Sequence, residues 1–423
     1  MRPALSTPRR DAMIAFGRMA PRVAVVGGGA SACALVHALG EDISSGVIQL
    51  SLFEMGRGVG GRSATRRSRE MPELLLDHGV PAFSARTESF AELCERFVDA
   101  GHLGRLSKTD PSQSIGILRQ DGTYEAEPSD DTPPRFTAAA GKGISTFCEG
   151  LIRGGGDNSS SPIVSTVFST MVKELVPLDE GGWRLAGKDG TDLGEFDWLV
   201  VAGNVLGHPR WSSAFGGSPP LVAAAGQMDD APLHDALAAL SKLQHNPVTA
   251  CLLAFEGDAA KVWASLPFFK CAFEEDPVLA RLVVRRVSPT LTTAVVHSTH
   301  AFSLGVSDVY GSTSTAARLG GAGTNAEREA VILEEMLAAL EARLVPKWLS
   351  DATMLKPAWG PHLHRWGSAF PAAPMLPERH AWVPSARVAF CGDYVEGGRA
   401  GTVEGAVTSG LRTGHLLREE LLQ

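Results

Sequence analysis

The most regular pattern of hydrophobic and polar positions lies near the start of the chain. Residues 23 to 26 are an uninterrupted apolar run, typical of a strand buried on both faces of a parallel sheet. Three glycines at 27 to 29 follow, and residues 30 to 39 place apolar side chains on one side of a predicted helix. Residues 47 to 53 predict a second strand, which ends at Glu54. These segments together have the length of one strand–helix–strand unit.

Apolar runs and helical spacings continue to the end of the chain. We expect further strands at 163–168, 170–176, 183–187, 195–202, 248–255, 281–297 and 387–391, and helices at 84–100, 144–152, 326–344 and 403–417. Residues 107 to 137 are rich in turn formers and predict irregular structure, and residues 154 to 161 predict a flexible loop. A second strand–glycine–helix element closes the chain, so one domain must be built from both ends.

The predicted fold is therefore an α/β fold with two interleaved domains. One is a Rossmann-like nucleotide-binding domain with a parallel sheet, and the other is a smaller α+β substrate domain with a mainly antiparallel sheet. We expect a disordered N-terminal extension at 1–20, the nucleotide-binding domain at 21–105, 141–210 and 379–423, and the substrate domain at 106–140 and 211–378.

Composition narrows the possible partners. The 423 residues include 39 Lys and Arg against 47 Asp and Glu, and the resulting net charge of −8 argues against nucleic-acid binding. The chain has no run of 18 apolar residues, so no transmembrane helix is expected. The six cysteines are scattered without a CxxC pair, which favours reduced core residues, no metal site and an intracellular, reducing compartment.

The first 22 residues carry five arginines and have no apolar core of a secretory signal. Plastid or mitochondrial targeting and a plain disordered extension both stay open for this segment.

The first glycine motif, Gly27-x-Gly29-x-x-Ala32, follows a strand and opens a helix. The first glycine permits a tight turn, the second lets the backbone approach a pyrophosphate, and the small third residue lets the helix pack on the strand. The helix N-terminus offers free N–H groups to the anion. Glu54, at the end of the second strand, stands where an acid binds a ribose diol. We therefore predict dinucleotide binding, with a tight turn and a surface acid as the alternative.

Two further glycine-rich segments indicate a long cofactor. Arg57 and Arg62 lie in a loop with four glycines, which can wrap a diphosphate and the start of a ribityl chain. A solvated basic loop is the alternative, and we favour it for the arginines at 66, 67 and 69. Near the end of the chain, Asp393 follows a strand and can accept a hydrogen bond from a ribityl hydroxyl, or merely cap a turn. The helix from Val403 can face the pyrimidine edge of a flavin.

These motifs together resemble the FAD-dependent amine oxidase superfamily. Residues 77 to 79, Asp-His-Gly, resemble the segment that runs along the flavin there, and residues 364 to 371 resemble a segment of the renalase-like branch. The resemblance implies FAD, bound non-covalently because Cys391 lies inside the closing strand. It also implies hydride transfer to flavin N5 from a small substrate, a reduced nicotinamide isomer or an amine, with O₂ or another acceptor reoxidising the cofactor. Only Tyr394 among the three tyrosines falls in a suitable motif, which puts ordinary amine oxidation in doubt.

Two other functions stay open: a desaturase or protoporphyrinogen-oxidase-like enzyme for a large apolar substrate, and a non-catalytic FAD-binding protein. The expected catalytic residues are His78, His364, Trp366 and Tyr394. The expected cofactor-binding residues are Gly27, Gly29, Ala30, Ser31, Ala32, Glu54, Met55, Arg57, Gly60, Gly61, Arg62, His78, Gly79, Val167, Gly392, Asp393, Thr402 and Val403. Lys356 is a weaker candidate for orienting a water. His297 and His300 lie three apart in a strand, on opposite faces, and are not expected to bind a metal. The substrate and the oligomeric state stay open.

Overall fold

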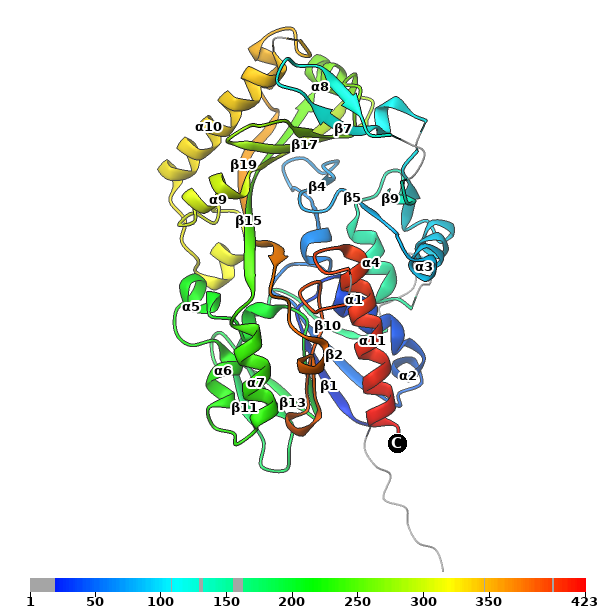
Figure 1. The fold of residues 1–423 in the computed structure, drawn as a ribbon, viewed down its shortest axis with the longest axis vertical. Coiled ribbons are helices and arrows are strands. Elements are labelled where there is room, and N and C mark those ends of the chain that lie inside the picture. Colours follow the sequence, from blue (N-terminus) through cyan, green and yellow to red (C-terminus); the bar gives the residue numbers. More distant parts are fainter. Residues whose placement is uncertain (1–19, 108, 129–131, 155–162, 346, 398) are drawn as a thin grey trace, which may run out of the picture.

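A parallel sheet with helices on its faces forms the base of the computed structural model, which describes residues 20–107, 109–128, 132–154, 163–345, 347–397 and 399–423. The sheet has the order β10-β2-β1-β14-β21-β20, and every neighbouring pair is parallel except β20 with β21. Its strands are β1 (Arg22–Val26), β2 (Gln49–Phe53), β10 (Ser165–Val167), β14 (Trp198–Val201), β20 (Trp382–Val383) and β21 (Val388–Phe390). Strands from both ends and the middle of the chain thus form one sheet (Figure 1).

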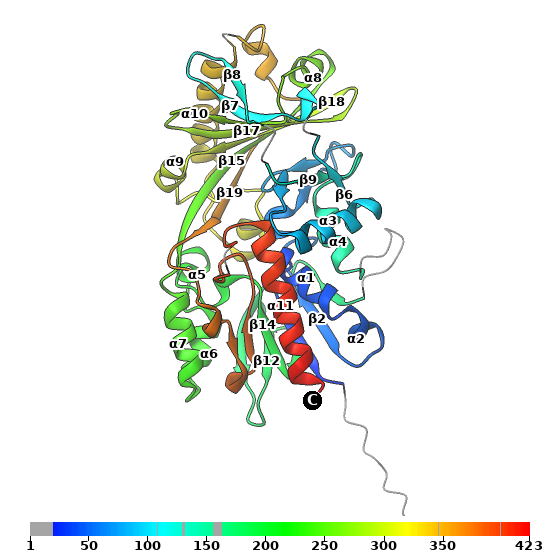
Figure 2. The same ribbon diagram turned by 45° about the vertical axis from the view of Figure 1, so that its right-hand side comes forward.

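The first and last helices of the described chain pack against each other on this sheet. They are α1 (Ala30–Ala38) and α11 (Val403–Leu421), and they lie side by side in Figures 1 and 2. A Cβ at Gly410 of α11 would lie 2.0 Å from the carbonyl oxygen of Ser31, so glycine is required for this close approach. The same domain contains α2 (Gly40–Ser44), α3 (Glu88–Asp99), α4 (Ser145–Leu151) and the small sheet of β5 (Ala82–Ser84), β6 (Leu103–Arg105) and β9 (Arg135–Ala138).

A second hydrophobic core lies on the other face of the parallel sheet. It is built from the apolar residues of a three-stranded antiparallel sheet and three helices, and includes the fully buried Trp183 and Phe390. The strands are β11 (Val172–Pro177), β12 (Trp183–Gly187) and β13 (Asp192–Phe196), and the helices are α5 (Arg210–Phe215), α6 (Pro220–Ala225) and α7 (Ala231–Leu240).

The upper part of the molecule is a seven-stranded sheet with the order β19-β15-β18-β17-β16-β7-β8. Five of its six neighbouring pairs are antiparallel, and only β16 and β7 pair parallel. The strands are β7 (Ile115–Leu118), β8 (Tyr124–Ala126), β15 (Gln244–Glu256), β16 (Lys270–Phe273), β17 (Leu279–Ser288), β18 (Leu291–Ser298) and β19 (Trp359–Ala372). The long strands β15 and β19 also reach down toward the base (Figure 2).

The two faces of the seven-stranded sheet have different neighbours. One face packs against α8 (Gly257–Ala264) and α10 (Ala326–Leu344), with α9 (His300–Gly305) beside them. On the other face, Ala250 and Leu252 cluster with Leu74 and Leu76 beside β4 (Leu76–Asp77), which pairs with β3 (Thr65–Arg66). That face is turned toward the parallel sheet. The space in which the flavin is expected therefore lies between the two sheets.

The predicted fold class is confirmed: a parallel Rossmann-like sheet is joined to an antiparallel one. The helix expected at 326–344 has these bounds, but the run at 281–297 is two strands joined by a tight turn. The prediction of irregular structure at 107–137 was wrong, because short strands with alternating burial lie there and pair with distant segments. The N-terminal extension to residue 19 and most of the expected loop at 154–161 lie outside the described residues. None of the helices in the described ranges combines the length and the hydropathy of a membrane-spanning segment.

Candidate active site

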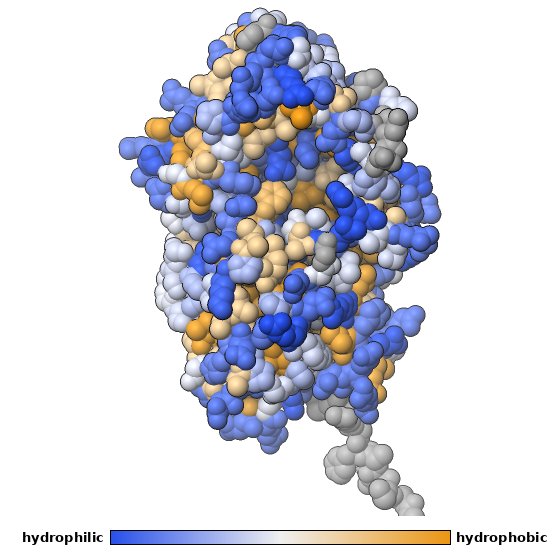
Figure 3. Space-filling model, in the orientation of Figure 1, coloured by the Kyte–Doolittle hydropathy of each residue, from blue (hydrophilic) through white to orange (hydrophobic). Residues whose placement is uncertain are grey.

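A cavity of about 790 Å³ lies between the carboxyl edge of the parallel sheet and the seven-stranded sheet. It is lined by residues 27–31, 54–67 and 78–80 from the start of the chain and by residues 364–371, 392–394, 401–403 and 406 from its end. The two glycine-rich ends of the Rossmann-like domain therefore face one space. Figure 3 shows hydrophobic side chains gathered toward the middle of this face of the molecule, within a mostly hydrophilic surround.

The first glycine loop leaves the N-terminus of α1 open to the cavity. Gly27 has a φ of +105°, and a Cβ there would lie 3.2 Å from the backbone nitrogen of Gly203, so this turn suits glycine. Gly29 is the N-cap of α1, and no side chain caps the helix. A Cβ at Gly29 would meet no protein atom within 4 Å, so that position opens onto empty space. The uncapped N–H groups are a ready anion site.

The second glycine loop packs against the first through backbone atoms. The N–H of Gly60 donates to the carbonyl of Gly28 at 2.7 Å, and Gly60 forms a bridge with Gly29. Gly61 has a φ of +53°, and a Cβ there would lie 3.3 Å from the Cα of Gly29. The two loops can approach this closely because neither has side chains between them.

Glu54 connects both loops at the end of β2. Its carboxylate accepts hydrogen bonds from the N–H of Gly28 at 2.6 Å and of Gly56 at 2.5 Å. Burial raises the pKa of Glu54, while the two backbone N–H donors act in the opposite direction. Because a carboxylate has about four lone-pair positions, Glu54 can still accept hydrogen bonds from a ribose diol in the cavity.

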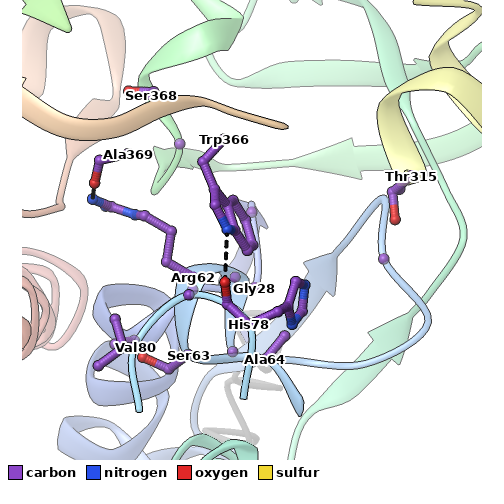
Figure 4. Close-up of a pocket in the computed structure, with 18 of the residues that line it drawn as sticks. Gly28, Arg62, Ser63, Ala64, His78, Val80, Thr315, Trp366, Ser368 and Ala369 are labelled. Carbon is purple, nitrogen blue, oxygen red and sulfur yellow. Dashed lines mark hydrogen bonds between the residues drawn. The ribbon is translucent and has the colours of Figure 1, made fainter. Parts of the chain in front are cut away.

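Arg62 and Asp393 are joined directly, which the sequence did not indicate. The guanidinium of Arg62 donates to both carboxylate oxygens of Asp393, at 2.6 and 2.7 Å, and to the carbonyl of Ala369 at 2.8 Å. Figure 4 shows Arg62 reaching from its loop toward Ala369. Asp393 is 6% exposed and Arg62 is 33% exposed. This pair links the second glycine loop, the closing strand and β19 at one point of the cavity wall.

His78, His364 and Trp366 form an aromatic wall. Their ring centroids are 4.4 to 5.0 Å apart, and the indole N–H of Trp366 donates to the carbonyl of His78 at 3.1 Å (Figure 4). Burial lowers the pKa of His78 to about 4 and that of His364 well below its usual value. Both rings are therefore neutral near pH 7, and their Nδ1 atoms have no hydrogen-bond partner among the described residues.

His297 is a third histidine of this wall, although it was not among the expected site residues. Its Nε2–H donates to the carbonyl of His78 at 3.0 Å, and burial lowers its pKa to about 3. Across the sheet, Arg281 pairs with His297, His297 with Ala250, and Ala250 with His364. Directly paired residues point to the same face, and Arg281, His297 and His364 of this row all line the cavity. The position of His297 in this row depends on strand register, which the sequence does not show.

Most predicted site residues line this cavity. Of the expected cofactor-binding residues, only Ala32 and Val167 are absent from its lining: Ala32 is fully buried behind the first loop, and Val167 lies on β10 beside β2. Tyr394 is 3% exposed, and its hydroxyl donates to the carbonyl of Val201 at 2.8 Å, so the hydroxyl is engaged in a structural bond.

Two weaker interpretations need correction. Arg66 was expected to lie in a solvated loop, but it is half-buried, lines the cavity and lies over the ring of Trp359 at 5.5 Å. Lys356 is exposed and is not part of the lining, so it has no place in the site. Among the residues that the structure describes, no group of three or more His, Cys, Asp or Glu could hold a metal ion.

The residues of the cavity fit a flavin dinucleotide. The uncapped end of α1, with open space beside Gly29, suits a diphosphate, and Glu54 suits a ribose diol. The neutral rings of His78, His364 and Trp366 suit a planar, partly apolar ring system. All six cysteines, Cys391 included, are buried and form no disulfide.

Two family models match the chain. The model for the NAD(P)-binding Rossmann-like domain matches residues 25–97, and the model for flavin containing amine oxidoreductase matches residues 165–414.

Solved structures of the same fold cover nearly the whole chain. One is described as a "putative protoporphyrinogen oxidase" from Exiguobacterium sp. 255-15, with a TM-score of 0.59, 13% identity, and coverage of 96% of this chain and 100% of that one. Another is a wild-type putrescine oxidase bound to putrescine, with a TM-score of 0.57, 11% identity, and coverage of 94% and 99%. At these identities the likeness establishes the fold alone.

Proposed function

The chain belongs to the flavin-containing amine oxidoreductase family, and on that premise we propose that this FAD-dependent oxidoreductase removes a hydride from a small substrate held against His78, His364 and Trp366. The observation that supports this most directly is the single cavity. It extends from the open N-terminus of α1 to the aromatic wall, so one bound molecule can reach both.

The chain's own residues would hold FAD at several points. The N–H groups at the start of α1 and the Gly60–Gly61 backbone would face the diphosphate, and Glu54 would bind the ribose. Gly392 and Thr402 would lie beside the remaining part, near the N-terminus of α11. FAD supplies the electron-accepting ring system, and the protein supplies position and polarity.

The aromatic wall would position the substrate rather than exchange protons with it. His78 and His364 are neutral near pH 7, so neither is a ready proton donor of the imidazolium type. Their Nδ1 atoms are buried, so the two rings would offer the substrate an uncharged surface, and the indole of Trp366 would exclude water from one side.

We propose a renalase-like substrate range, a reduced nicotinamide isomer or an amine, with O₂ or another acceptor closing the cycle. A large apolar substrate, as for a protoporphyrinogen-oxidase-like enzyme, is less favoured because eight arginines line the cavity.

The experiment is an anaerobic titration of the purified holoprotein, followed by visible absorbance. Wild type should show a flavin spectrum that bleaches with one of a panel of dihydronicotinamide isomers and amines. The variant Trp366→Phe should keep the spectrum and bleach more slowly, since it loses the indole N–H that fixes the His78 segment. Arg286→Gln, an exposed change on the same sheet, should bleach like wild type. A flavin that no member of the panel reduces would contradict the proposal.

A further inference from the structure

The cavity is strongly cationic although the whole protein is acidic. Three carboxylates line it, Glu54, Glu149 and Asp393, against eight arginines. The arginines are Arg57, Arg62, Arg66, Arg67, Arg210, Arg281, Arg318 and Arg365. Among the residues the structure describes, only Arg62 of these eight has a carboxylate within 4 Å. The net charge of the chain is −8, so the positive charge in this space is a local arrangement.

The cofactor accounts for only part of this charge. A diphosphate is a dianion, and it would lie at the N-terminus of α1 with the arginines of the second glycine loop within reach. Arg210, Arg281 and Arg365 come from α5, β17 and β19, on the opposite wall. These three arginines face the part of the cavity where the substrate would lie.

Arg281 is the arginine that pairs directly with His297 across the sheet. It is half-buried and belongs to the cross-sheet row that contains His297 and His364. Its guanidinium lies over the ring of Phe370 at 5.2 Å. A ring face attracts the cation but accepts none of its five N–H donors in a conventional hydrogen bond, and no side-chain hydrogen bond or ion pair of Arg281 occurs among the described residues.

Arg285, on the same strand, is an arginine with a structural role and polar partners within the protein. Arg285 lies four residues further along β17, on the same face, and its Nη1 is 2.5 Å from the buried carboxylate of Asp77. Its Nη2 donates to the carbonyl of Lys142. Asp77 also accepts from Thr65 and from the N–H of Ile144, so both of its carboxylate oxygens have donors. Arg281 has the same strand and the same face but lacks any such partner.

We propose that the substrate is an anion and that Arg281 binds its carboxylate or phosphate group against the His297–His364 row. This inference rests on the proposed function, because it places the substrate at the aromatic wall. A planar guanidinium binds either group through two parallel hydrogen bonds, and the Phe370 ring holds its plane in position. An ammonium group at the same place would meet like charge from Arg281, Arg210 and Arg365 without a nearby carboxylate to offset it.

The test uses three probes that share a phenyl ring: benzoate, phenyl phosphate and benzylamine. Each is titrated calorimetrically into the purified holoprotein, a reading that needs neither turnover nor a change in flavin absorbance. At least one anion should bind more tightly than benzylamine, and its affinity should fall as salt rises. Benzoate and phenyl phosphate distinguish a carboxylate site from a phosphate site.

Variants assign the binding to Arg281. Arg281→Gln should weaken binding of the preferred anion by about tenfold or more, and Arg281→Lys by less, since lysine keeps the charge but not the fork. Arg286→Gln removes an exposed charge from the same strand and should change the affinity by less than about twofold. Tighter binding of benzylamine, anion binding indifferent to Arg281→Gln, or no anion binding would each overturn the inference. If the purified protein contained no flavin, the proposed function would be refuted. The calorimetric titrations would still decide whether Arg281 binds an anion.

Discussion

Arg62 and Asp393 form a bidentate ion pair across 331 positions of sequence, with N–O distances of 2.6 and 2.7 Å. Arg62 belongs to the loop after β2, and Asp393 follows β21, so the pair joins the early and late parts of the Rossmann-like domain. The carboxylate is almost fully buried and the guanidinium is one-third exposed. The pair therefore closes the domain at the wall of the cavity, next to the place where the cofactor would lie.

Asp393→Asn should destabilise the protein and weaken its hold on FAD. The change removes the charge that neutralises Arg62, and the cost should be about 2–4 kcal/mol, toward the low end because Arg62 is partly solvated. Urea unfolding of the apoprotein measures the stability, and flavin fluorescence measures the retained cofactor. Glu195→Gln breaks an exposed pair with Arg184 and should cost less than about 1 kcal/mol. Equal, small costs for both variants would show that the Arg62–Asp393 pair is not structural.

Gly29→Ala should impair cofactor binding while leaving the fold intact. Gly29 has an ordinary φ of −74°, and a Cβ there meets no protein atom within 4 Å, so alanine fits the empty protein. The new methyl group would lie where the diphosphate must approach the backbone. We expect the affinity of the apoprotein for FAD to fall about tenfold or more, with less than about 0.5 kcal/mol lost in urea unfolding.

Two glycines serve as controls for this substitution. Gly305→Ala also enters open space, but Gly305 is exposed and does not line the cavity, so FAD affinity should not change. Gly410→Ala would lie 2.0 Å from the carbonyl of Ser31 and should lower the free energy of unfolding instead. Unchanged FAD affinity in Gly29→Ala would mean that the diphosphate does not lie at this helix.

The sequence predicted the Rossmann-like half well because its signals are local. Residues 23 to 39 contain a buried strand, a glycine turn and an apolar helix in order, although the helix is buried all round at residues 31 to 36 and not on one side alone. Glu54 could be assigned from its distance to the first motif alone. The closing helix from Val403 was predicted in the same way. It ends at Leu421 and not at residue 417 as predicted, because its last turn is mostly exposed and polar.

The opposite wall of the cavity could not be predicted because it depends on strand register. Arg281, His297 and His364 come from three strands and become neighbours only through the pairings of β17, β18, β15 and β19. Hydrophobic alternation indicates which residues share a face of one strand but not which residues of other strands lie beside them. Short strands such as β7 were missed because their pairing partners lie far away in the sequence.

Tyr394→Phe should affect stability and leave the redox reaction unchanged. The hydroxyl of Tyr394 donates to the carbonyl of Val201 at 2.8 Å, and burial raises its pKa well above the usual value. Loss of this buried hydrogen bond should cost about 1 kcal/mol in urea unfolding. The rate of anaerobic flavin reduction should match wild type, since the hydroxyl does not face a substrate. A reduction rate about tenfold slower at unchanged stability would restore Tyr394 to the catalytic residues.

The buried histidines should make the protein less stable as the pH falls below 6.5. Burial lowers the pKa of His78 from 6.5 to about 4 and that of His297 to about 3. Above pH 6.5 the rings are neutral in both the folded and the unfolded chain, so the stability is fully present there. Between pH 6.5 and about 4, the unfolded chain binds protons that the folded protein does not, and each histidine then lowers the free energy of unfolding by up to about 1.4 kcal/mol per pH unit.

Urea unfolding at pH 7, 6 and 5 measures this slope. His297→Gln should reduce it by the contribution of one proton, whereas His415→Gln, on the exposed face of α11, should leave it as in wild type. The test depends on comparing variants, because other groups also change the free energy of unfolding over this pH range. Burial raises the pKa values of Glu54 and Asp77, and these carboxyl groups stabilise the folded protein as the pH falls, opposite to the histidines. If the slope of His297→Gln equals that of wild type, His297 must already be able to take up a proton in the folded protein. His297 would then be a second cation beside Arg281 in the row that faces the cavity.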